Sequence, residues 1–229
     1  VDAYTKGLNF YNLNIATFQQ QHPQIIESTK TVIEQAYRIR GNAKKELADY
    51  KGAILDYSKS IEMNSTLSES IYSRGVIYME TNNFDLAKKD FSKVLEINPN
   101  DAGAYRNLGN AKFQLEDFSG AVYDYSKAII LSISIEHRAE VYNNRGSALS
   151  ALGQYQNAAL DFEKALEINP ADPVAIANKR ELQPHLGGQQ FFMNPTDMTN
   201  LNEIITFELG MTLTGMFNSK RYTTAEIID

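Results

Sequence analysis

Residues 71–97 read IYSRGVIYMETNNFDLAKKDFSKVLEI, and residues 105–131 read YRNLGNAKFQLEDFSGAVYDYSKAIIL. The same phrase returns over residues 37–63 and 142–168. Its glycines Gly41, Gly75 and Gly109 lie 34 residues apart, and Gly146 follows 37 residues later. A repeat of this length predicts a row of stacked supersecondary units. The search for function therefore turns to the long surface that such a row presents, because no compact catalytic pocket is implied.

Each copy predicts two helices joined by a tight turn. In the second half of the first copy, apolar residues recur at the spacing of an amphipathic helix; they are Tyr50, Ala53, Ile54, Tyr57 and Ile61. Short polar joints separate the two halves: Ala48-Asp49, Thr81-Asn82-Asn83, Glu116-Asp117 and Gly153-Gln154. Because the joints are short, the two helices of a copy are expected to lie antiparallel, and the fold class is all-α.

Small and aromatic residues at fixed places predict how the helices touch. Each glycine sits in the middle of a helix, where it costs about 0.5–1 kcal/mol relative to alanine, so four in one phase imply a steric need. Ala53, Ala87, Ala121 and Ala158 recur on the second helix. The aromatic pairs are expected to fill the space between copies; they are Tyr50/Tyr57, Phe84/Phe91, Phe118/Tyr125 and Tyr155/Phe162.

At these residues the chain resembles the tetratricopeptide repeat family, which has a 34-residue period and a pattern of Gly, Tyr, Ala, Phe and Pro. With each glycine as position 8, the repeats cover residues 34–67, 68–101, 102–138 and 139–170. The resemblance implies a right-handed superhelical solenoid with capping helices. The chain departs from the family at position 4, where Tyr or Ile replaces Trp, and at two closing prolines. Three extra residues near Ser132–Arg138 are expected to lengthen a helix or a loop.

The segment before the first repeat does not carry the pattern cleanly. Gly7 is in phase with Gly41, but the matching aromatic and alanine are absent. Residues 1–33 are expected to form an N-terminal helical cap or a degenerate repeat, with a second helix after Pro23, and to shield the first repeat.

Three segments follow the last repeat. Residues 171–183 are expected to form a capping helix, with Asp172 as N-cap and Pro173 in the first turn. Residues 184–197 are interpreted as a linker. Residues 198–229 are expected to be a helical segment, as the start of a further repeat or as a tail that packs elsewhere.

Composition excludes several classes of function. The net charge is −6 and the pI is near 5.2, with no cluster of Lys and Arg, so neither nucleic acid nor membrane insertion is expected. Cysteine is absent, which excludes thiol catalysis and Cys-based zinc sites without fixing the compartment; the cytoplasm is favoured over the periplasm or secretion. The three histidines lie far apart and no phosphate loop or nucleophile motif appears. We therefore expect no enzyme, no cofactor and no metal site.

Charged residues also recur in phase. Position 7 is Arg in three repeats and position 23 is Asp in all four: Arg40, Arg74 and Arg145, with Asp56, Asp90, Asp124 and Asp161. A lysine follows each Asp by three residues, a spacing that gives a mild pair on one helix face. We interpret these residues as a scaffold ladder of ion pairs rather than a binding stripe. Leu108 replaces the arginine of the third repeat, which indicates that the pairing is not obligatory.

The resemblance implies that partners bind along the concave face, which the first helices supply at positions 2, 5, 6, 9, 12 and 13. The candidates for holding a peptide or protein partner are Arg38, Asn42, Tyr72, Arg106, Asn107, Asn110, Phe113, Asn143, Asn144 and Asn178. The asparagines would hold peptide backbone, since an amide both donates and accepts. Arg106 would hold an acidic group, and Phe113 and Tyr72 apolar side chains.

One binding pattern of the family is an asparagine ladder, as in O-linked GlcNAc transferases, with Asn at position 6 of successive repeats. Asn107 and Asn144 match it, and Asn178 matches if the phase continues past the fourth repeat. Ser73 and Ile39 do not match. The ladder is therefore partial and confined to the C-terminal half.

A second pattern is the carboxylate clamp of chaperone-binding co-chaperones. Arg106, Asn110 and Asn144 satisfy its first two parts, but the cations of its third part are replaced by Val174 and Asn178. A full clamp is not expected, although Arg106 with Asn110 would still suit an isolated acidic group.

The expected function is a protein-interaction scaffold or adaptor that binds an extended peptide or a partner helix. The alternative is a self-assembling or regulatory module of a larger enzyme or envelope complex. In that case residues 184–229 would serve as an intramolecular or intermolecular ligand, through Phe191, Phe192 and Met193, and the chain would form a homo-oligomer.

Overall fold

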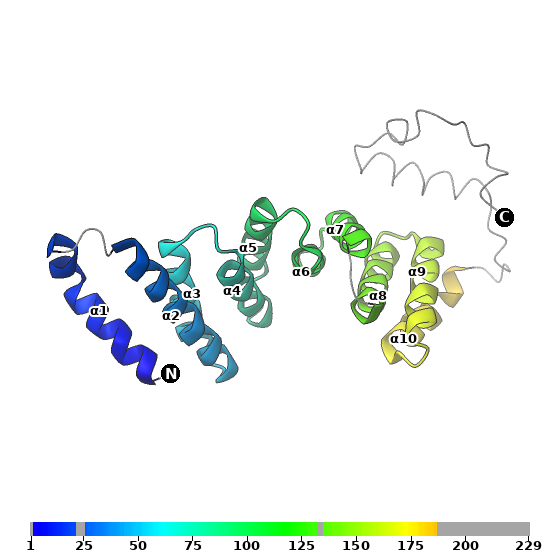
Figure 1. Ribbon diagram of the computed structural model, residues 1–229. Helices are drawn as coiled ribbons and strands as arrows, with labels where there is room; N and C mark the ends of the chain where they lie inside the picture. The colour runs from blue at the N-terminus through cyan, green and yellow to red at the C-terminus, as the bar shows by residue number, and fades with distance from the viewer. Residues whose placement is uncertain (1, 22–25, 132–134, 187–229) are drawn as a thin grey trace, which may run out of the picture. The chain divides into compact units, whose positions relative to one another are not determined.

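The computed structural model describes residues 2–21, 26–131 and 135–186, and this part of the chain consists of α-helices and one short 3-10 helix without any strand (Figure 1). All of it belongs to one compact unit, residues 1–187. The second unit, residues 188–229, lies outside the described residues, as do the expected helical segment 198–229 and Phe191, Phe192 and Met193. Among the described helices, none is both long and apolar enough to cross a membrane.

Four helical hairpins follow one another along the described chain. They are α2 (Ile26–Glu46) with α3 (Tyr50–Met63), α4 (Ser68–Glu80) with α5 (Phe84–Ile97), α6 (Ala102–Gln114) with α7 (Phe118–Leu131), and α8 (Ile135–Ala151) with α9 (Tyr155–Ile168). The helix α1 (Asp2–Gln21) packs on α2, and α10 (Pro173–Leu182), which continues into η2 (Gln183–His185), packs on α9. The first helices also contact one another in order, from α2 through α4, α6 and α8 to α10. The chain is an all-α solenoid in which these helices share one face, called the inner face below.

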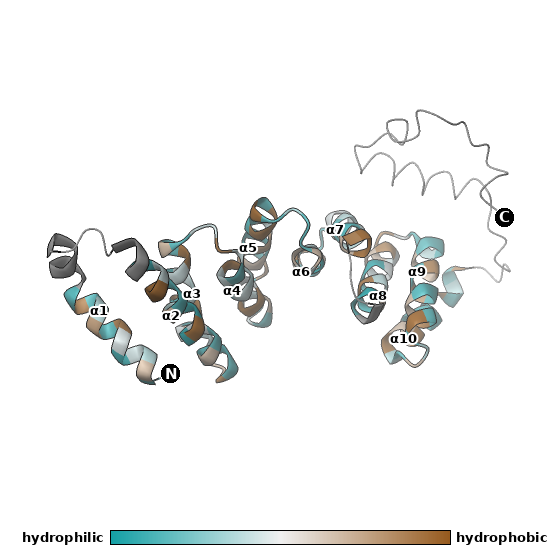
Figure 2. Ribbon diagram, in the orientation of Figure 1, coloured by the Kyte–Doolittle hydropathy of each residue, from teal (hydrophilic) through white to brown (hydrophobic). Residues whose placement is uncertain are grey.

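Glycine and an aromatic ring meet inside every hairpin. A Cβ atom on Gly41 would lie 2.9 Å from Tyr57, and one on Gly109 would lie 2.7 Å from Tyr125. The equivalent pairs in the other two repeats are Gly75 with Phe91 and Gly146 with Phe162. The rings also reach the next repeat, since Tyr57 packs with Ile77 in one buried cluster. Figure 2 shows brown, apolar segments alternating with teal, hydrophilic ones along the helices.

The turn between the two helices of a hairpin always contains one residue with positive φ. These residues are Ala48 (58°), Asn82 (58°), Glu116 (61°) and Gly153 (73°). Glycine adopts this left-handed conformation without strain, whereas alanine and glutamate do not. The turn geometry is therefore common to all four repeats, and only the fourth has glycine there.

Two first helices are longer than the repeat requires. The helix α2 runs unbroken from Ile26 to Glu46, so the segment before the first repeat contributes its second helix to that repeat instead of forming a separate one. No proline or glycine separates residues 26 and 37, which explains the continuity. The helix α8 has 17 residues, against 13 in α4 and in α6, so it takes up part of the insertion near Ser132–Arg138.

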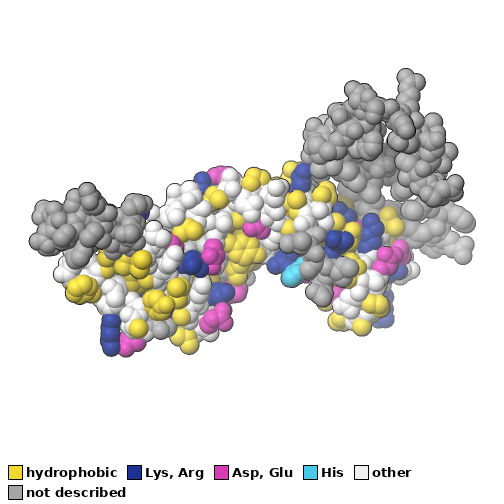
Figure 3. All heavy atoms as spheres, viewed as in Figure 1, with side chains coloured by type: hydrophobic (Ala, Val, Ile, Leu, Met, Phe, Trp, Pro, Cys, Tyr) yellow, Lys and Arg dark blue, Asp and Glu magenta, His cyan; other side chains and the backbone are white. Residues whose placement is uncertain are grey.

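Both end helices cover part of the core. In α1 the side chain of Leu8 is buried, and Asn12 Nδ2 donates to the Tyr37 hydroxyl at 2.9 Å. Phe10 and Leu13 on the same helix are exposed, and apolar side chains gather on the N-terminal helices in Figure 3. At the other end, Asp172 caps α10 as expected, because its carboxylate accepts from the amides of Val174 and Ala175.

The arginines of the ladder bind the aspartates in bidentate geometry. Arg74 donates to Asp90 at 2.8 Å from Nε and from Nη2, and Arg145 does the same with Asp161 at 2.7 and 2.8 Å. The third donor of each arginine reaches a serine of the preceding repeat at 2.9 Å: Ser58 for Arg74, and Ser126 for Arg145. These position-7 arginines therefore stabilise their own hairpin and its junction with the previous one.

The third repeat keeps an ion pair without the arginine. Lys112 Nζ lies 2.7 Å from Asp124 Oδ2, so Asp124 is paired with a lysine where Leu108 replaces the arginine. The expected pairs between each aspartate and the lysine three residues later are not what forms in the first two repeats. Lys59 and Lys93 instead bind Glu62 and Glu96, because arginines already occupy the aspartates.

Candidate functional site

Two asparagines on the inner face are held by buried tyrosines. The Tyr57 hydroxyl donates to Asn42 Oδ1 at 2.6 Å, and the Tyr125 hydroxyl donates to Asn110 Oδ1 at 2.7 Å. Burial raises the pKa of both tyrosines, so the hydroxyls stay protonated and remain donors. Each tyrosine therefore fixes its asparagine with the oxygen turned inward, which leaves the Nδ2 amino group to be offered to a ligand.

Two arginines lie at position 5 of the first and third repeats. Arg38 Nη1 lies 2.6 Å from Glu69 Oε1, and Arg106 Nη1 lies 3.3 Å from Glu140 Oε2. In both pairs the glutamate belongs to position 2 of the next repeat and is the more exposed partner. Each arginine thus contacts a carboxylate through one nitrogen only, and a bound acidic group would compete with that glutamate.

The asparagines at position 6 bind backwards, to the preceding repeat. Asn107 Nδ2 donates to the Tyr72 hydroxyl at 2.7 Å, and Asn144 Nδ2 donates to Asn110 Oδ1 at 3.1 Å. Asn178 Nδ2 donates to Asn143 Oδ1 at 3.1 Å. The three members of the expected ladder are therefore spaced along the inner face. Asn107 and Asn144 each bridge two repeats, and Asn178 joins α10 to the fourth repeat.

The remaining candidates are packed more deeply. Asn143 is buried, with 7% of its surface exposed, and its oxygen holds Asn178. Phe113 is half-buried against the core of the third repeat, with its ring edge-on to Phe118 at 5.3 Å between centroids. Tyr72 packs edge-on to Phe91 at 5.5 Å, and burial raises its pKa. Tyr72 and Phe113 are therefore partly engaged in core packing and are not free rings on the surface.

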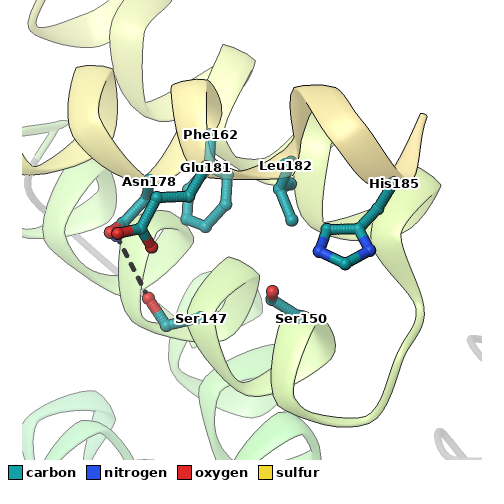
Figure 4. Close-up of a pocket in the computed structure, with 7 residues that line it drawn as sticks. All are labelled: Ser147, Ser150, Phe162, Asn178, Glu181, Leu182 and His185. Atoms are coloured by element: carbon teal, nitrogen blue, oxygen red, sulfur yellow. Dashed lines mark hydrogen bonds between the residues drawn. The ribbon is translucent and has the colours of Figure 1, made fainter. Parts of the chain in front are cut away.

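A cavity of about 220 Å³ lies between α8 and α10, at the C-terminal end of the inner face (Figure 4). Phe162 and Leu182 form its apolar part, and its polar lining consists of Ser147, Ser150, Asn178, Glu181 and His185. The His185 ring stacks on Tyr155 at 4.3 Å between centroids. Glu181 is the one charged group in this lining, so the cavity suits a polar or cationic side chain better than an acidic one.

The described ranges contain no group of side chains that could hold a metal ion. Across residues 2–21, 26–131 and 135–186, no three His, Asp or Glu side chains come together in a way that could hold a metal ion. Lys and Arg alternate with Asp and Glu on the face seen in Figure 3, without a continuous basic patch. What the inner face offers is a series of amide and guanidinium donors, which suits the carbonyl and carboxylate groups of a peptide.

The link between position 9 and position 24 was missed from the sequence, although the signal is visible there. Where position 24 is Tyr, position 9 is Asn, as in Tyr57 with Asn42 and Tyr125 with Asn110. Where position 24 is Phe, position 9 carries another residue; Val76 and Ser147 stand there. The aromatic residues were interpreted as packing residues alone, so the bonds from the tyrosine hydroxyls to the asparagines of the inner face were overlooked.

Comparisons with known proteins agree with this architecture. The family model for the tetratricopeptide repeat matches residues 68–101 and 139–172. No curated protein matches the sequence. Among solved structures, the MamA protein is 20% identical with a TM-score of 0.64, covering 83% of this chain and 98% of MamA. YrrB, described as a protein of this repeat type with an unusual peptide-binding site, is 22% identical with a TM-score of 0.63, covering 72% and 83%. The first repeat domain of Spaghetti (RPAP3), bound to the HSP90 peptide SRMEEVD, is 25% identical with a TM-score of 0.50, covering 53% and 94%.

Proposed function

Because the chain carries tetratricopeptide repeats, we propose that it is a protein-interaction scaffold that binds an extended peptide along its inner face. The observation that carries this proposal is the row of polar donors on the first helices. Asn42, Asn110 and the two position-5 arginines retain donors without a partner among the described residues. Carbonyl oxygens of an extended chain are the natural acceptors for such donors.

The repeat-spanning asparagines support the same proposal. Asn107 and Asn144 lie where a peptide crossing two or three first helices would pass, and each uses its amino group within the chain. Their oxygens remain to accept from peptide N–H groups, while Asn110 Nδ2 donates to peptide carbonyls. The proposed binding mode therefore takes hydrogen bonds from the peptide backbone and leaves selectivity to the arginines and to the cavity beside α10.

The solved relatives favour a peptide as the partner. The Spaghetti (RPAP3) domain holds a short peptide that contains acidic residues, and YrrB is described as having a peptide-binding site. For this chain a peptide partner is consistent with the open donors of Arg38 and Arg106. The proposed partner is an extended segment with accessible carbonyl and carboxylate groups.

The test is selection followed by substitution. A display library of random peptides is selected against the full chain, and a selected peptide is titrated calorimetrically into the wild type and into the double variant Asn107→Ala, Asn144→Ala. Loss of two peptide hydrogen bonds is expected to weaken binding by about 1–3 kcal/mol. The control is Asn100→Ala, since Asn100 is exposed in the loop before α6. Equal affinity of all three proteins would reject the inner-face binding mode, and a selection that enriches no peptide would reject the function.

A further inference from the structure

Position 12 of the first helices carries a large side chain in three repeats and a serine in the fourth. Lys45, Met79 and Phe113 stand there in the first three repeats, and Ser150 stands there in the fourth. Met79 and Phe113 pack against buried core residues. Ser147, three residues before Ser150 on the same side of α8, is also small. The two serines leave space between α8 and α10, which explains why the cavity of about 220 Å³ lies at this repeat.

The hydrogen bonds of the cavity wall use its donors and leave its acceptors. Asn178 Nδ2 donates to Asn143 Oδ1 at 3.1 Å and to Ser147 Oγ at 3.3 Å. The Ser147 hydroxyl in turn donates to the backbone carbonyl of Asn143 at 3.0 Å. Both amino hydrogens of Asn178 and the hydroxyl hydrogen of Ser147 are therefore engaged within the chain. What these two side chains still offer is the Oδ1 oxygen of Asn178 and a lone pair of Ser147, which only accept.

Glu181 adds a negative charge to these acceptors. It follows Asn178 by three residues on α10, so the two side chains lie on the same side of that helix, and Figure 4 shows them facing α8. Within the described ranges the Glu181 carboxylate has no hydrogen bond or ion pair, and the nearby Lys179 binds Glu163 at 2.9 Å instead. A carboxylate without a counter-ion, beside neutral acceptors, is suited to a cation that can donate hydrogen bonds.

Two residues of the lining are apolar. Phe162 and Leu182 are almost completely buried and belong to one core cluster. Contact with such side chains favours methylene groups over water. The cavity is large enough for a whole side chain, since a cavity of about 150 Å³ already holds a benzene ring. The lining therefore offers apolar contact for a long stem and acceptors for a charged end.

We propose that this cavity, called the α8–α10 pocket below, binds one lysine side chain of the peptide. The methylene groups of the lysine pack on Phe162 and Leu182. Its ammonium group donates to the Glu181 carboxylate and to Asn178 Oδ1. Lysine suits the pocket better than arginine, because an ammonium group directs its three donors to separate acceptors, whereas the planar guanidinium suits a single carboxylate. This proposal rests on the proposed function, and it names a side chain that the peptide presents beside α10.

A purely structural role explains only part of the wall. The bonds from Asn178 to Asn143 and Ser147 hold α10 on α8, and they need no ligand. They do not account for a glutamate without a partner in the lining. The pocket also differs from the rest of the inner face, where Asn42 and Asn110 offer an amino group. The inner face therefore changes from donors to acceptors at α10, which gives the peptide a basic residue at this end.

The first experiment tests the pocket with a small probe. The full chain, labelled with 15N, is titrated with Nα-acetyl-lysine N-methylamide, and the side-chain amide signal of Asn178 is followed by NMR. A shift with a dissociation constant on the order of 1 mM is expected for a ligand of this size. The norleucine analogue, which keeps the stem and lacks the charge, is expected to bind about tenfold more weakly. The arginine analogue should fall between the two.

Two substitutions test the charge and the space of the pocket. Glu181→Gln removes the charge at an exposed position, so it is expected to weaken the lysine probe about three- to tenfold and to leave the norleucine probe unaffected. Ser150→Met introduces the position-12 residue of the second repeat and fills the cavity, so it is expected to abolish binding of both probes. Glu167→Gln, at an exposed glutamate of α9 outside the lining, is the matched control. Thermal unfolding checks that each variant is folded, and Glu181→Gln decides alone if Ser150→Met is not.

The second experiment extends the test to a peptide. A peptide selected from the display library is expected to contain a lysine whose replacement by norleucine weakens binding about tenfold in the wild type. In Glu181→Gln the same replacement is expected to cost less than about threefold, because the two groups act on each other.

Three results would overturn the proposal: no shift of the Asn178 signal with the lysine probe, equal affinity for the lysine and norleucine probes, or an unchanged lysine affinity in Glu181→Gln. If selected peptides lose affinity in the variant Asn107→Ala, Asn144→Ala but not in Glu181→Gln, the pocket proposal is wrong and the scaffold function stands. If the library enriches no peptide while the lysine probe still binds beside Asn178, the peptide function is rejected and the pocket keeps its preference for a cationic side chain.

Discussion

Lys112 binds Asp124, with 2.7 Å between Nζ and Oδ2. In the other three repeats an arginine binds the equivalent aspartate, and that arginine lies one helical turn before the position of Lys112. The residue at the arginine position is Leu108, which is buried and cannot pair. Asp124 is almost completely buried, and burial raises its pKa to about 6 against the partial compensation by Lys112. The ion pair with Lys112 therefore does not fully offset the cost of burying the Asp124 carboxylate.

The first prediction concerns the pH dependence of stability. Because the folded pKa of Asp124 lies above its unfolded value of 3.8, the folded state binds more protons between about pH 4 and pH 6, and this aspartate's contribution to stability is lost as the pH rises through 6. Asp124→Asn is expected to be more stable than the wild type at pH 7 by about 1–3 kcal/mol and to lose that slope. Urea unfolding at pH 4 and pH 7 measures both. Asp90→Asn is the contrast. It removes the carboxylate that the half-buried Arg74 binds through two nitrogens, so it should be destabilising. A stabilised Asp90→Asn would contradict the prediction.

The second prediction concerns glycine under the aromatic rings. Gly109→Ala places a Cβ atom 2.7 Å from Tyr125 and is expected to lower the free energy of unfolding by about 1–3 kcal/mol, since the ring has to move. Gly7→Ala is the matched control, because Gly7 is also within a helix but has open space where its Cβ would lie. It should be neutral or stabilising by up to about 1 kcal/mol. Thermal unfolding of both variants decides the matter, and equal effects would reject the close-packing explanation.

The third prediction uses the positive-φ residue of each turn. Ala48→Gly and Glu116→Gly remove the strain of a side chain in the left-handed region, and each is expected to stabilise the chain by about 0.5–1 kcal/mol. Gly153→Ala introduces the same strain and should destabilise by a similar amount. The denaturant midpoints of Ala48→Gly and Glu116→Gly should therefore rise, and the midpoint of Gly153→Ala should fall. A Gly153→Ala variant as stable as the wild type would show that the turns relax to another geometry.

The fourth prediction tests whether the buried Tyr125 hydroxyl orients the side-chain amide of Asn110. Tyr125→Phe keeps the ring against Gly109 and removes the donor to Asn110, so we expect a loss of about 1 kcal/mol in stability. The side-chain amide of Asn110 should also gain mobility, seen as a lower heteronuclear NOE of its amino group. Tyr123→Phe serves as the control because Tyr123 lies on the same helix, α7, but is exposed. An unchanged Asn110 signal in Tyr125→Phe would show that the Tyr125 hydroxyl does not orient the Asn110 amide.

The period of the sequence predicted the architecture because packing residues repeat whenever the same contact is made. Gly41 and its equivalents, and the Asp172 cap of α10, are local features that a single sequence reveals. The continuous α2 was harder to predict, because nothing in residues 26–46 marks a boundary between the leading segment and the first repeat. The pairing of Asp124 with Lys112 was missed because only position 7 and the lysine three residues after each aspartate were considered as partners.

The sequence predicted which positions lie on the inner face, but it did not predict the contacts that their side chains make. A register of positions identifies which residues lie on the first helices, but it does not show that Arg38 and Arg106 already touch glutamates, or that Asn143 is buried. These facts depend on the side chain opposite, one repeat away. The roles assigned to the ten candidate residues therefore remain proposals that binding measurements have to decide.

Two arginines reach back to a serine of the preceding hairpin: Arg74 bonds Ser58, and Arg145 bonds Ser126. One bridge therefore joins the first hairpin to the second, and the other joins the third to the fourth. At the junction of the second and third hairpins, Leu108 stands where that arginine would be. A longer version of this protein built by duplicating residues 34–101 as a cassette would therefore carry one more of these bridges complete, with its arginine and its serine together.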